Sequence, residues 1–272
     1  MQEFIPNHLL IEIKDGTLHC LDWGGEGPPI LLLHGLQDCA SNWDHIAKSL
    51  SVNFHVYALD SRGHGDSQHL PGKYRFEDYV HEIEEVIETL GLEHVTIVGH
   101  SAGGKYAFSY VAQDNHKAKN LVIIDMDPDQ FNPGSASMFD RYHKEDDTWP
   151  SLEKVIQRIS EREPRTSISL LKDQSIAMTR IQHDGTLIWK RDRSVLLEYE
   201  RPDAWGCLSS IKIRTLLMRG EDSQLLTQSV AEKMAKQIPT CDLVIVPNAG
   251  HWCYGENPEE FLQLLNAFLH DS

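Results

Sequence analysis

The sequence predicts an α/β core in which a mostly parallel sheet is covered by helices and interrupted by one inserted segment. Two observations support this. Short β-rich runs alternate with longer helical patterns between residues 9 and 126, an order typical of a parallel sheet with helices on its faces. The alternation stops near residue 127 and resumes after residue 210. We therefore expect a core of residues 1–126 and 211–272 and a mainly helical inserted segment of residues 127–210.

Composition limits the classes of protein to consider. The 272 residues carry 25 Lys and Arg against 41 Asp and Glu, a formal net charge of −16. Hydrophobic residues make up 40% of the chain, which is enough for the core of a globular domain. The surplus of carboxylates repels phosphate groups, and no run of basic residues offsets it, so nucleic acid is not an expected partner.

The sequence also bears on location and redox state. The longest purely aliphatic run, Ile30–Leu33, is far shorter than the roughly 18 residues expected of a membrane span. The first residues lack the basic start and apolar core of a secretory signal. Five scattered cysteines with no C-x-x-C pair favour reduced thiols over a disulfide framework or a zinc site. We expect a cytoplasmic protein without membrane insertion, and the oligomeric state stays open.

The elements before the inserted segment are predicted from apolar patterns. An antiparallel pair opens the chain, and four continuous apolar runs then predict buried strands. The clearest helix is 76–90, whose apolar residues recur at three-and-four spacing. Its glutamates at 82, 84, 85 and 88 are expected on a solvent-exposed face. The expected strands are residues 11–13, 18–23, 29–34, 54–60, 94–100 and 121–125.

Fewer elements are predicted after residue 126. Apolar residues between Leu152 and Ile159 fit one helix, and His183–Thr186 is predicted to form a hairpin turn. The last helix has a capping Asn257 and Pro258 in its first turn. The other expected elements are a strand at 215–218, a helix at 227–238 and a strand at 243–246.

The sharpest chemical motif is the G-x-S-x-G sequence of residues 99–103, centred on Ser101. It follows the apolar strand 95–98 and precedes the helix-prone run 105–112, the context that a nucleophile elbow requires. Such a tight turn needs small neighbours and exposes the serine oxygen at the carboxyl edge of the sheet. The bare pattern also arises by chance in loops, but the strand before it and the helix after it favour a nucleophile.

A serine hydroxyl is a weak nucleophile and needs an adjacent base that a carboxylate holds in place. His251 lies between the last strand and the last helix, so we expect it at the same sheet edge as Ser101. Donors for an oxyanion are expected from the backbone N–H groups of Ala102 and Leu36. His34, two residues before Leu36, is expected to hold its loop by hydrogen bonds.

Four motifs occur in a recognisable order: H-G-L at 34–36, D-S-R-G-H-G-D-S at 60–67, G-H-S-A-G-G at 99–104 and N-A-G-H-W at 248–252. This order resembles the α/β-hydrolase superfamily over nearly the whole chain, in particular serine esterases and thioesterases with a cap insertion. The resemblance implies an eight-stranded, mostly parallel sheet, a cap after the sixth strand, and a Ser-acid-His triad in that chain order.

The acid of the triad departs from the common pattern of the superfamily. Many members carry it after the seventh strand, where this chain has Ser223 and Gln224. Asp125 ends the sixth strand and resembles the acid of a subgroup of esterases and thioesterases. Asp222 lies one residue from the usual position. We favour Asp125 and keep Asp222 as the alternative; Asp125 could also simply cap the turn that follows it.

We expect a serine hydrolase that cleaves an ester or thioester of a small, fairly apolar substrate through an acyl-enzyme. Relatives that open epoxides or remove halogens carry an aspartate where this chain has Ser101. The alternatives are a C–C bond hydrolase or lactonase with the same triad, and a ligand-binding receptor on a hydrolase scaffold. No cofactor is expected. Arg62, His64 and Asp66 in the 60–67 loop favour a bracing network over a metal site.

Overall fold

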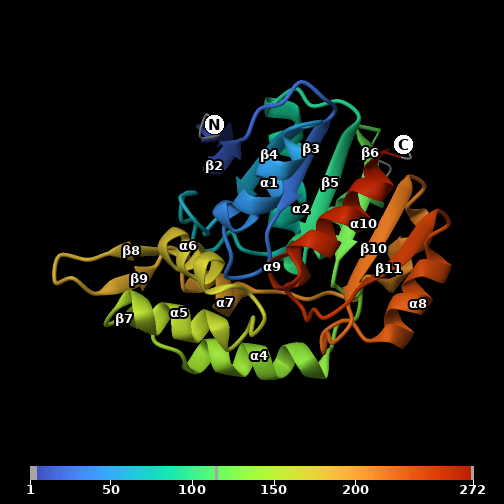
Figure 1. The fold of residues 1–272 in the computed structure, drawn as a ribbon. Helices are drawn as coiled ribbons and strands as arrows, with labels where there is room; N and C mark the ends of the chain where they lie inside the picture. The colour runs from blue at the N-terminus through green and yellow to red at the C-terminus, as the bar shows by residue number, and fades with distance from the viewer. Residues whose placement is uncertain (1–4, 114–115, 271–272) are drawn as a thin grey trace.

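The computed structural model describes residues 5–113 and 116–270, and its main feature is one eight-stranded sheet (Figure 1). The strand order is β1-β2-β4-β3-β5-β6-β10-β11. Strand β2 is antiparallel to both neighbours, and the remaining pairs are parallel. This confirms the predicted fold class. The prediction that the first residues form no secretory signal falls partly on residues 1–4, which lie outside the described residues. The strands are β1 (Asn7–Ile13), β2 (Gly16–Asp22), β3 (Pro29–Leu33), β4 (His55–Asp60), β5 (Val95–His100), β6 (Ala118–Ile124), β10 (Arg214–Gly220) and β11 (Cys241–Val246).

Helices cover both faces of this sheet, with α1 and α10 in front of it and α2 behind it in Figure 1. Apolar side chains of α2, α3 and α8 pack into one buried cluster, and those of α1 and α10 pack into another on the opposite face. Among the described residues, no helix has the length and apolar character to cross a membrane. The helices of the core are η1 (Ala40–Trp43), α1 (Asp44–Leu50), α2 (Phe76–Thr89), α3 (Ala102–Val111), α8 (Gln228–Gln237), α9 (Cys253–Glu256) and α10 (Pro258–His270). At the end of the inserted segment, η2 (Trp205–Ser210) also packs Leu208 into the core.

The inserted segment, between β6 and β10, lies at one end of the sheet, drawn from light green to yellow-orange in Figure 1. It has its own apolar cluster, which includes Val155, Ile159 and Trp189. A small antiparallel sheet of order β7-β9-β8 contains the predicted hairpin turn at His183–Thr186. The elements are α4 (Pro133–Lys144), β7 (Thr148–Trp149), α5 (Leu152–Ser160), α6 (Ile168–Met178), β8 (Thr179–Ile181), β9 (Leu187–Trp189) and α7 (Ser194–Glu198).

One prediction about α2 is wrong. Glu82 was expected on the solvent-exposed face, yet its side chain is 1% exposed and its Oε2 accepts a hydrogen bond from Arg62 Nε at 2.8 Å. The apolar periodicity of a helix marks which residues face the sheet, but it carries no information about a cation that arrives from another loop. Arg62 follows β4 and reaches across to α2, so the position at the border of the apolar face is buried as an ion pair. Glu84 and Glu88 are exposed, as expected.

Candidate active site

Ser101 lies at the turn from β5 to α3 in a strained backbone conformation. Its φ of +53° and ψ of −123° are rare for a residue other than glycine. The turn is fixed because Ser101 N donates to Ile124 O at 2.9 Å. It is also tightly packed: a Cβ on Gly103 would lie 2.5 Å from the carbonyl oxygen of His34. The small residues of the G-x-S-x-G motif are therefore required by close backbone packing.

The structure brings Ser101, His251 and Asp125 into one hydrogen-bonded chain. His251 Nε2 lies 2.9 Å from Ser101 Oγ, and His251 Nδ1 lies 2.7 Å from Asp125 Oδ2. Ser101 follows β5, Asp125 follows β6 and His251 lies on the loop after β11, so three strand ends contribute to the group. All three residues are buried. Asp222 is instead half-exposed and pairs with Arg165 at 2.5 Å.

Asp125 makes further contacts that fix its orientation. Its Oδ1 accepts the N–H of Gly220 at 3.2 Å, and its Oδ2 also accepts the hydroxyl of Ser223 at 2.5 Å. Sequence reasoning treated Ser223 only as a position that lacks a carboxylate. The sequence did contain a signal for this role of Ser223. The residue lies where many related hydrolases carry the acid, and a hydroxyl there can orient a carboxylate supplied from β6.

Burial sets the protonation state of the group. Burial lowers the pKa of His251, so the imidazole is neutral at neutral pH. Burial raises the pKa of Asp125 to about 7, although hydrogen bonds from Ser223 and Gly220 act in the opposite direction. In its ionised form Asp125 accepts but does not donate, so Nδ1 of His251 then carries the proton and Nε2 is free to accept one. This is the tautomer that a general base beside Ser101 needs.

Leu36 and Ala102, the predicted oxyanion donors, line the same narrow cavity as Ser101. Ala102 is the first residue of α3, so its N–H has no acceptor within the helix. Leu36 follows β3, on a loop that approaches closely: a Cβ on Gly35 would lie 3.0 Å from the Cβ of Ser101. Both residues therefore lie beside the predicted nucleophile, and their role in binding an oxyanion stays a prediction.

Comparison with known proteins places this chain in a family. A family model described as "alpha/beta hydrolase fold" matches residues 28–258. The chain belongs to the α/β-hydrolase fold family. It is 25% identical over 277 residues to the sn-1-specific diacylglycerol lipase ABHD11 of Mus musculus. The alignment covers 93% of this chain and 84% of that protein. It is 24% identical over 259 residues to the esterase YbfF of Escherichia coli, covering 89% of this chain and 93% of that protein.

The fold of this α/β-hydrolase is also similar to solved structures. The crystal structure of E-2-(acetamidomethylene)succinate hydrolase matches it with a TM-score of 0.91 and 24% identity, over 97% of this chain and 99% of that one. The carboxylesterase CesB of Bacillus subtilis matches with a TM-score of 0.78 and 22% identity, over 99% and 93% of the two chains. The relatives are named as hydrolases, esterases and lipases, which supports hydrolase activity here.

Two adjoining cavities meet at the candidate site of this α/β-hydrolase. His251 lines a cavity of about 380 Å³ between the inserted segment and the loops after β10 and β11. Ser101 lines the narrower one, whose other walls are mainly apolar. Met138 and Leu225 line both cavities, so the two are neighbours. The apolar side chains around Ser101 are Leu36, Met126, Met138, Phe139, Tyr199 and Leu225.

A buried charge network beside the His251 loop was missed by sequence reasoning. Asp38, on the loop after β3, accepts from Arg162 Nη2 at 2.7 Å and from Trp252 Nε1 at 3.2 Å. The Arg162 guanidinium also lies over the Trp252 ring, 4.6 Å from its centroid. Burial alone would raise the pKa of Asp38, but Arg162 and His100 hold it below its ordinary value. The pair joins the inserted segment to the core next to His251.

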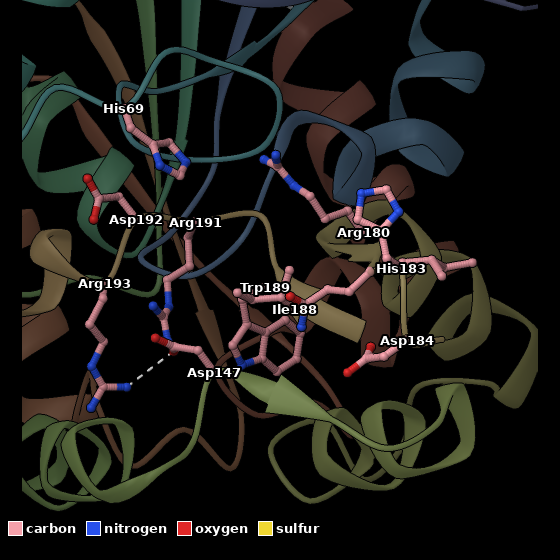
Figure 2. Close-up of a pocket in the computed structure, with 12 residues that line it drawn as sticks. His69, Asp147, Arg180, His183, Asp184, Ile188, Trp189, Arg191, Asp192 and Arg193 are labelled. Carbon is pink, nitrogen blue, oxygen red and sulfur yellow. Dashed lines mark hydrogen bonds and ion pairs between the residues drawn. The ribbon is translucent and has the colours of Figure 1, made fainter. Parts of the chain in front are cut away.

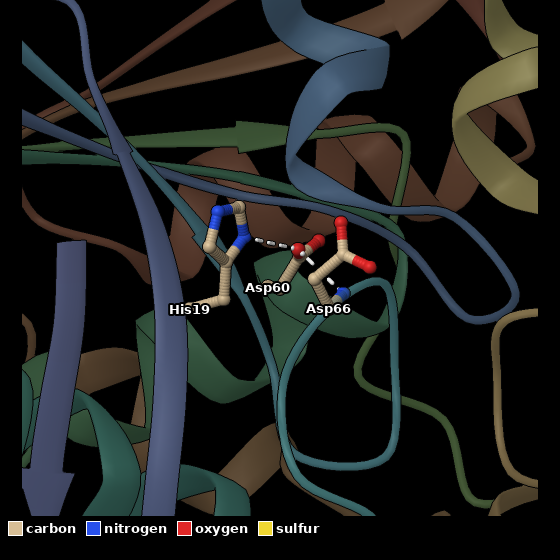
Figure 3. Close-up of side chains that lie close together, drawn as sticks. All are labelled: His19, Asp60 and Asp66. Atoms are coloured by element: carbon tan, nitrogen blue, oxygen red, sulfur yellow. Dashed lines mark hydrogen bonds and ion pairs between the residues drawn. The ribbon is translucent and has the colours of Figure 1, made fainter. Parts of the chain in front are cut away.

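A group of His19, Asp60 and Asp66 lies close enough to suggest a metal site (Figure 3). Asp60 Oδ2 is 2.7 Å from His19 Nδ1 and accepts the N–H of Asp66 at 3.0 Å, while Oδ1 accepts the N–H of Ala40 at 2.6 Å. Protein donors thus already occupy both oxygens of Asp60. The group braces the loop after β4, and we assign it no metal.

The histidine of the H-G-L motif has a similar structural task. His34 Nε2 accepts the N–H of Ser61 at 3.1 Å, and His34 Nδ1 donates to the carbonyl oxygen of Gly35 at 2.8 Å. These two bonds tie the loop after β3 to the loop after β4. The expectation that His34 holds its loop by hydrogen bonds is therefore met.

A more open groove of about 840 Å³ lies along the β8–β9 hairpin and residues 190–193 (Figure 2). None of the three residues of the Ser101 group lines it. Asp147 in this groove pairs with Arg191 at 2.5 Å and with Arg193 at 3.2 Å. Arg180, His183 and Asp184 also line it, and we assign the groove no function.

Proposed function

We propose that this α/β-hydrolase is a serine hydrolase that cleaves carboxylic ester or thioester bonds of small, fairly apolar substrates. The observation that carries the proposal is the continuous hydrogen-bonded chain from Ser101 through His251 to Asp125. The names of the relatives ABHD11 and YbfF, a lipase and an esterase, agree with it. The serine at position 101 selects an acyl-enzyme route, because a hydroxyl attacks an acyl carbon to form an ester.

In the first half of the reaction, Ser101 Oγ attacks the carbonyl carbon of the substrate while His251 Nε2 takes the hydroxyl proton. Asp125 keeps the imidazole oriented and stabilises the imidazolium that forms. The N–H groups of Leu36 and Ala102 stabilise the negative oxygen of the tetrahedral intermediate. The bond to the leaving alcohol or thiol then breaks, and His251 gives its proton to that leaving group.

In the second half, water replaces the leaving group beside His251. The imidazole takes a proton from this water, whose oxygen attacks the acyl carbon, and the same N–H groups stabilise the second oxyanion. The Ser101 ester bond breaks, His251 returns the proton to Ser101, and the carboxylic acid departs. These steps need no group beyond the chain's own residues and water.

The inserted segment acts in this proposal as a cap that forms the substrate cavity. Met138 and Phe139 of α4, together with Tyr199 beyond α7, provide the apolar walls beside Ser101. The Asp38–Arg162 pair holds the cap to the core.

Labelling with a fluorophosphonate tests the proposal. We expect one covalent adduct on Ser101 in the wild-type protein and none in Ser101→Ala. Ser109→Ala is a matched control, because Ser109 lies on α3 and has the same 9% exposure as Ser101. Hydrolysis of p-nitrophenyl butyrate should follow the labelling. An unreactive but folded wild-type protein would contradict the proposal and favour the receptor alternative.

A further inference from the structure

Arginine is distributed unevenly in this acidic chain. Eight of its twelve arginines belong to residues 127–210, although the net charge of the chain is −16. Four of the eight line the cavity that His251 also lines. The cavity volume of about 380 Å³ lies in the range of small-ligand sites. The four arginines are Arg141, Arg158, Arg162 and Arg165.

Two of these four arginines are already neutralised by carboxylates. Arg165 pairs with Asp222 at 2.5 Å and lies 3.9 Å from Glu256. Arg162 is held by Asp38 at 2.7 Å and by the adjacent Glu163 at 2.8 Å. Both are therefore engaged in holding the cavity wall together.

Arg158 is also paired with a carboxylate, Glu145, but Arg158 and Arg141 retain donors that the protein does not use. Arg158 is 9% exposed and donates from Nε to Glu145 at 2.5 Å, yet its Nη1 is buried with no acceptor among the described residues. Glu145 is not part of the cavity lining. Arg141 is exposed on α4, and its side chain makes no hydrogen bond or ion pair with any residue the structure describes.

These features point to an anionic ligand group. A buried guanidinium nitrogen without an acceptor is costly, because it has lost its hydrogen bonds to water. The planar fork of a guanidinium matches the two oxygens of a carboxylate. Glu161 is the lining carboxylate for which the structure gives no arginine partner, and it is exposed at the cavity mouth. A carboxylate on the substrate would give Arg158 and Arg141 the acceptor they lack.

The position of the cavity indicates which part of the substrate it receives. His251 returns a proton to the leaving group, so the leaving portion lies against His251. The arginine-lined cavity contains His251 but not Ser101, whereas the apolar cavity contains Ser101, Leu36 and Ala102. The cavity at Ser101 has a volume of only about 10 Å³ and so receives the reacting carbonyl group, whereas the leaving portion fits the arginine-lined cavity of about 380 Å³.

We propose that the leaving portion of the substrate carries a carboxylate, which Arg158 and Arg141 bind. This inference rests on the proposed function and narrows it to acyl esters of hydroxy acids or acyl thioesters of mercapto acids. Hydrolysis of such an ester consumes one water and yields the apolar acid from the acyl portion and the free hydroxy acid from the leaving portion.

Three esters of comparable size test the proposal. The probe is 3-(butyryloxy)benzoate, whose carboxylate lies on the leaving phenol. Phenyl butyrate has no charge, and monophenyl glutarate carries its carboxylate on the acyl portion. A hydrogen-bonded charge pair of this kind changes affinity by about tenfold to a hundredfold. We expect wild-type kcat/KM for 3-(butyryloxy)benzoate to exceed that for phenyl butyrate by at least about tenfold.

Variants test the arginines through one ratio, the kcat/KM for 3-(butyryloxy)benzoate divided by the kcat/KM for phenyl butyrate. Arg158→Gln and Arg141→Gln should each lower the ratio, mainly through KM. Arg141 is exposed and unpaired, so its substitution tests the proposal even if loss of the Arg158–Glu145 pair disturbs folding. Arg180→Gln is the matched control: Arg180 is an exposed arginine of the inserted segment that lines the other groove (Figure 2), and its variant should keep the wild-type ratio.

The outcomes separate this inference from the proposed function. A wild-type ratio near one, or a ratio that neither Arg158→Gln nor Arg141→Gln changes, would overturn the inference while leaving the serine hydrolase intact. A preference for monophenyl glutarate would place the charge on the acyl portion and would also overturn it. If the folded wild-type protein cleaves none of the three esters and takes no fluorophosphonate label, the proposed function itself fails.

Discussion

Replacing Asp125 with asparagine probes the orientation of His251 with little change in size. Asp125 Oδ1 accepts the N–H of Gly220, while Oδ2 accepts from both His251 Nδ1 and Ser223. An asparagine must keep its oxygen toward Gly220, because an NH₂ group there would face an N–H donor. Its NH₂ group then faces His251 and donates to Nδ1. The ring proton moves to Nε2, where it faces Ser101 and blocks proton removal.

The expected loss follows from this change of tautomer. The corresponding substitution in a serine protease triad lowers kcat by about ten-thousand-fold, which corresponds to roughly 5 kcal/mol of transition-state stabilisation. We expect Asp125→Asn to lower kcat for p-nitrophenyl butyrate by about a thousandfold to ten-thousand-fold. Initial rates at pH 7.5 measure it, with thermal unfolding of the same samples to show that the fold is kept.

Asp222→Asn is the matched control for this prediction. Asp222 is half-exposed and pairs with Arg165 rather than with His251, and such surface pairs contribute about 0–1 kcal/mol. Its substitution should leave kcat nearly unchanged. Asp125 is not the orienting acid if Asp222→Asn loses more activity than Asp125→Asn, or if Asp125→Asn keeps more than about a tenth of the wild-type kcat, since a wrong tautomer allows no such rate.

Three further predictions concern stability. Glu82→Gln leaves the buried Arg62 without its nearest counter-charge, and urea unfolding should show a loss of about 3 kcal/mol. Asp38→Asn removes a carboxylate whose pKa is held below its ordinary value of 3.8, so its stabilising contribution is present above that pH. The stability difference from wild type should be full at pH 7 and shrink as the pH falls below about 3.8; a difference independent of pH would contradict this. Gly103→Ala forces a Cβ to 2.5 Å from the His34 carbonyl, and we expect a lower melting temperature together with lost activity, whereas an unchanged melting curve would show that the turn can relax.

Local features of the site could be predicted from the sequence, because their causes are local. The turn at Ser101 needs a strand, small residues and a helix in immediate succession, and all three appear in the printed sequence around residues 95–112. The position of His251 after the last strand followed from chain order. The fold class followed from the alternation of apolar strands and amphipathic helices.

Features that join distant segments could not be predicted from the sequence. Asp125 and Asp222 were both reasonable partners for His251. Asp125 lies 126 residues before His251 in the sequence, and only the packing of the fold shows that it is the one that reaches Nδ1. Glu82 was misassigned because its partner Arg62 comes from a loop. The Asp38–Arg162 pair spans 124 residues and carries no periodic signal. Buried charges of this kind are visible only when the fold brings both partners together.

Ser101 should become covalently acylated during turnover, and mass spectrometry of the enzyme can detect the acyl group. The protein is mixed with excess p-nitrophenyl butyrate, quenched in acid within milliseconds and digested. We expect a butyryl group on the peptide that contains Ser101, in wild type but not in Ser101→Ala. Ester hydrolysis that proceeds with Ser101 unmodified, or with the acyl group on another residue, would rule out a Ser101 acyl-enzyme.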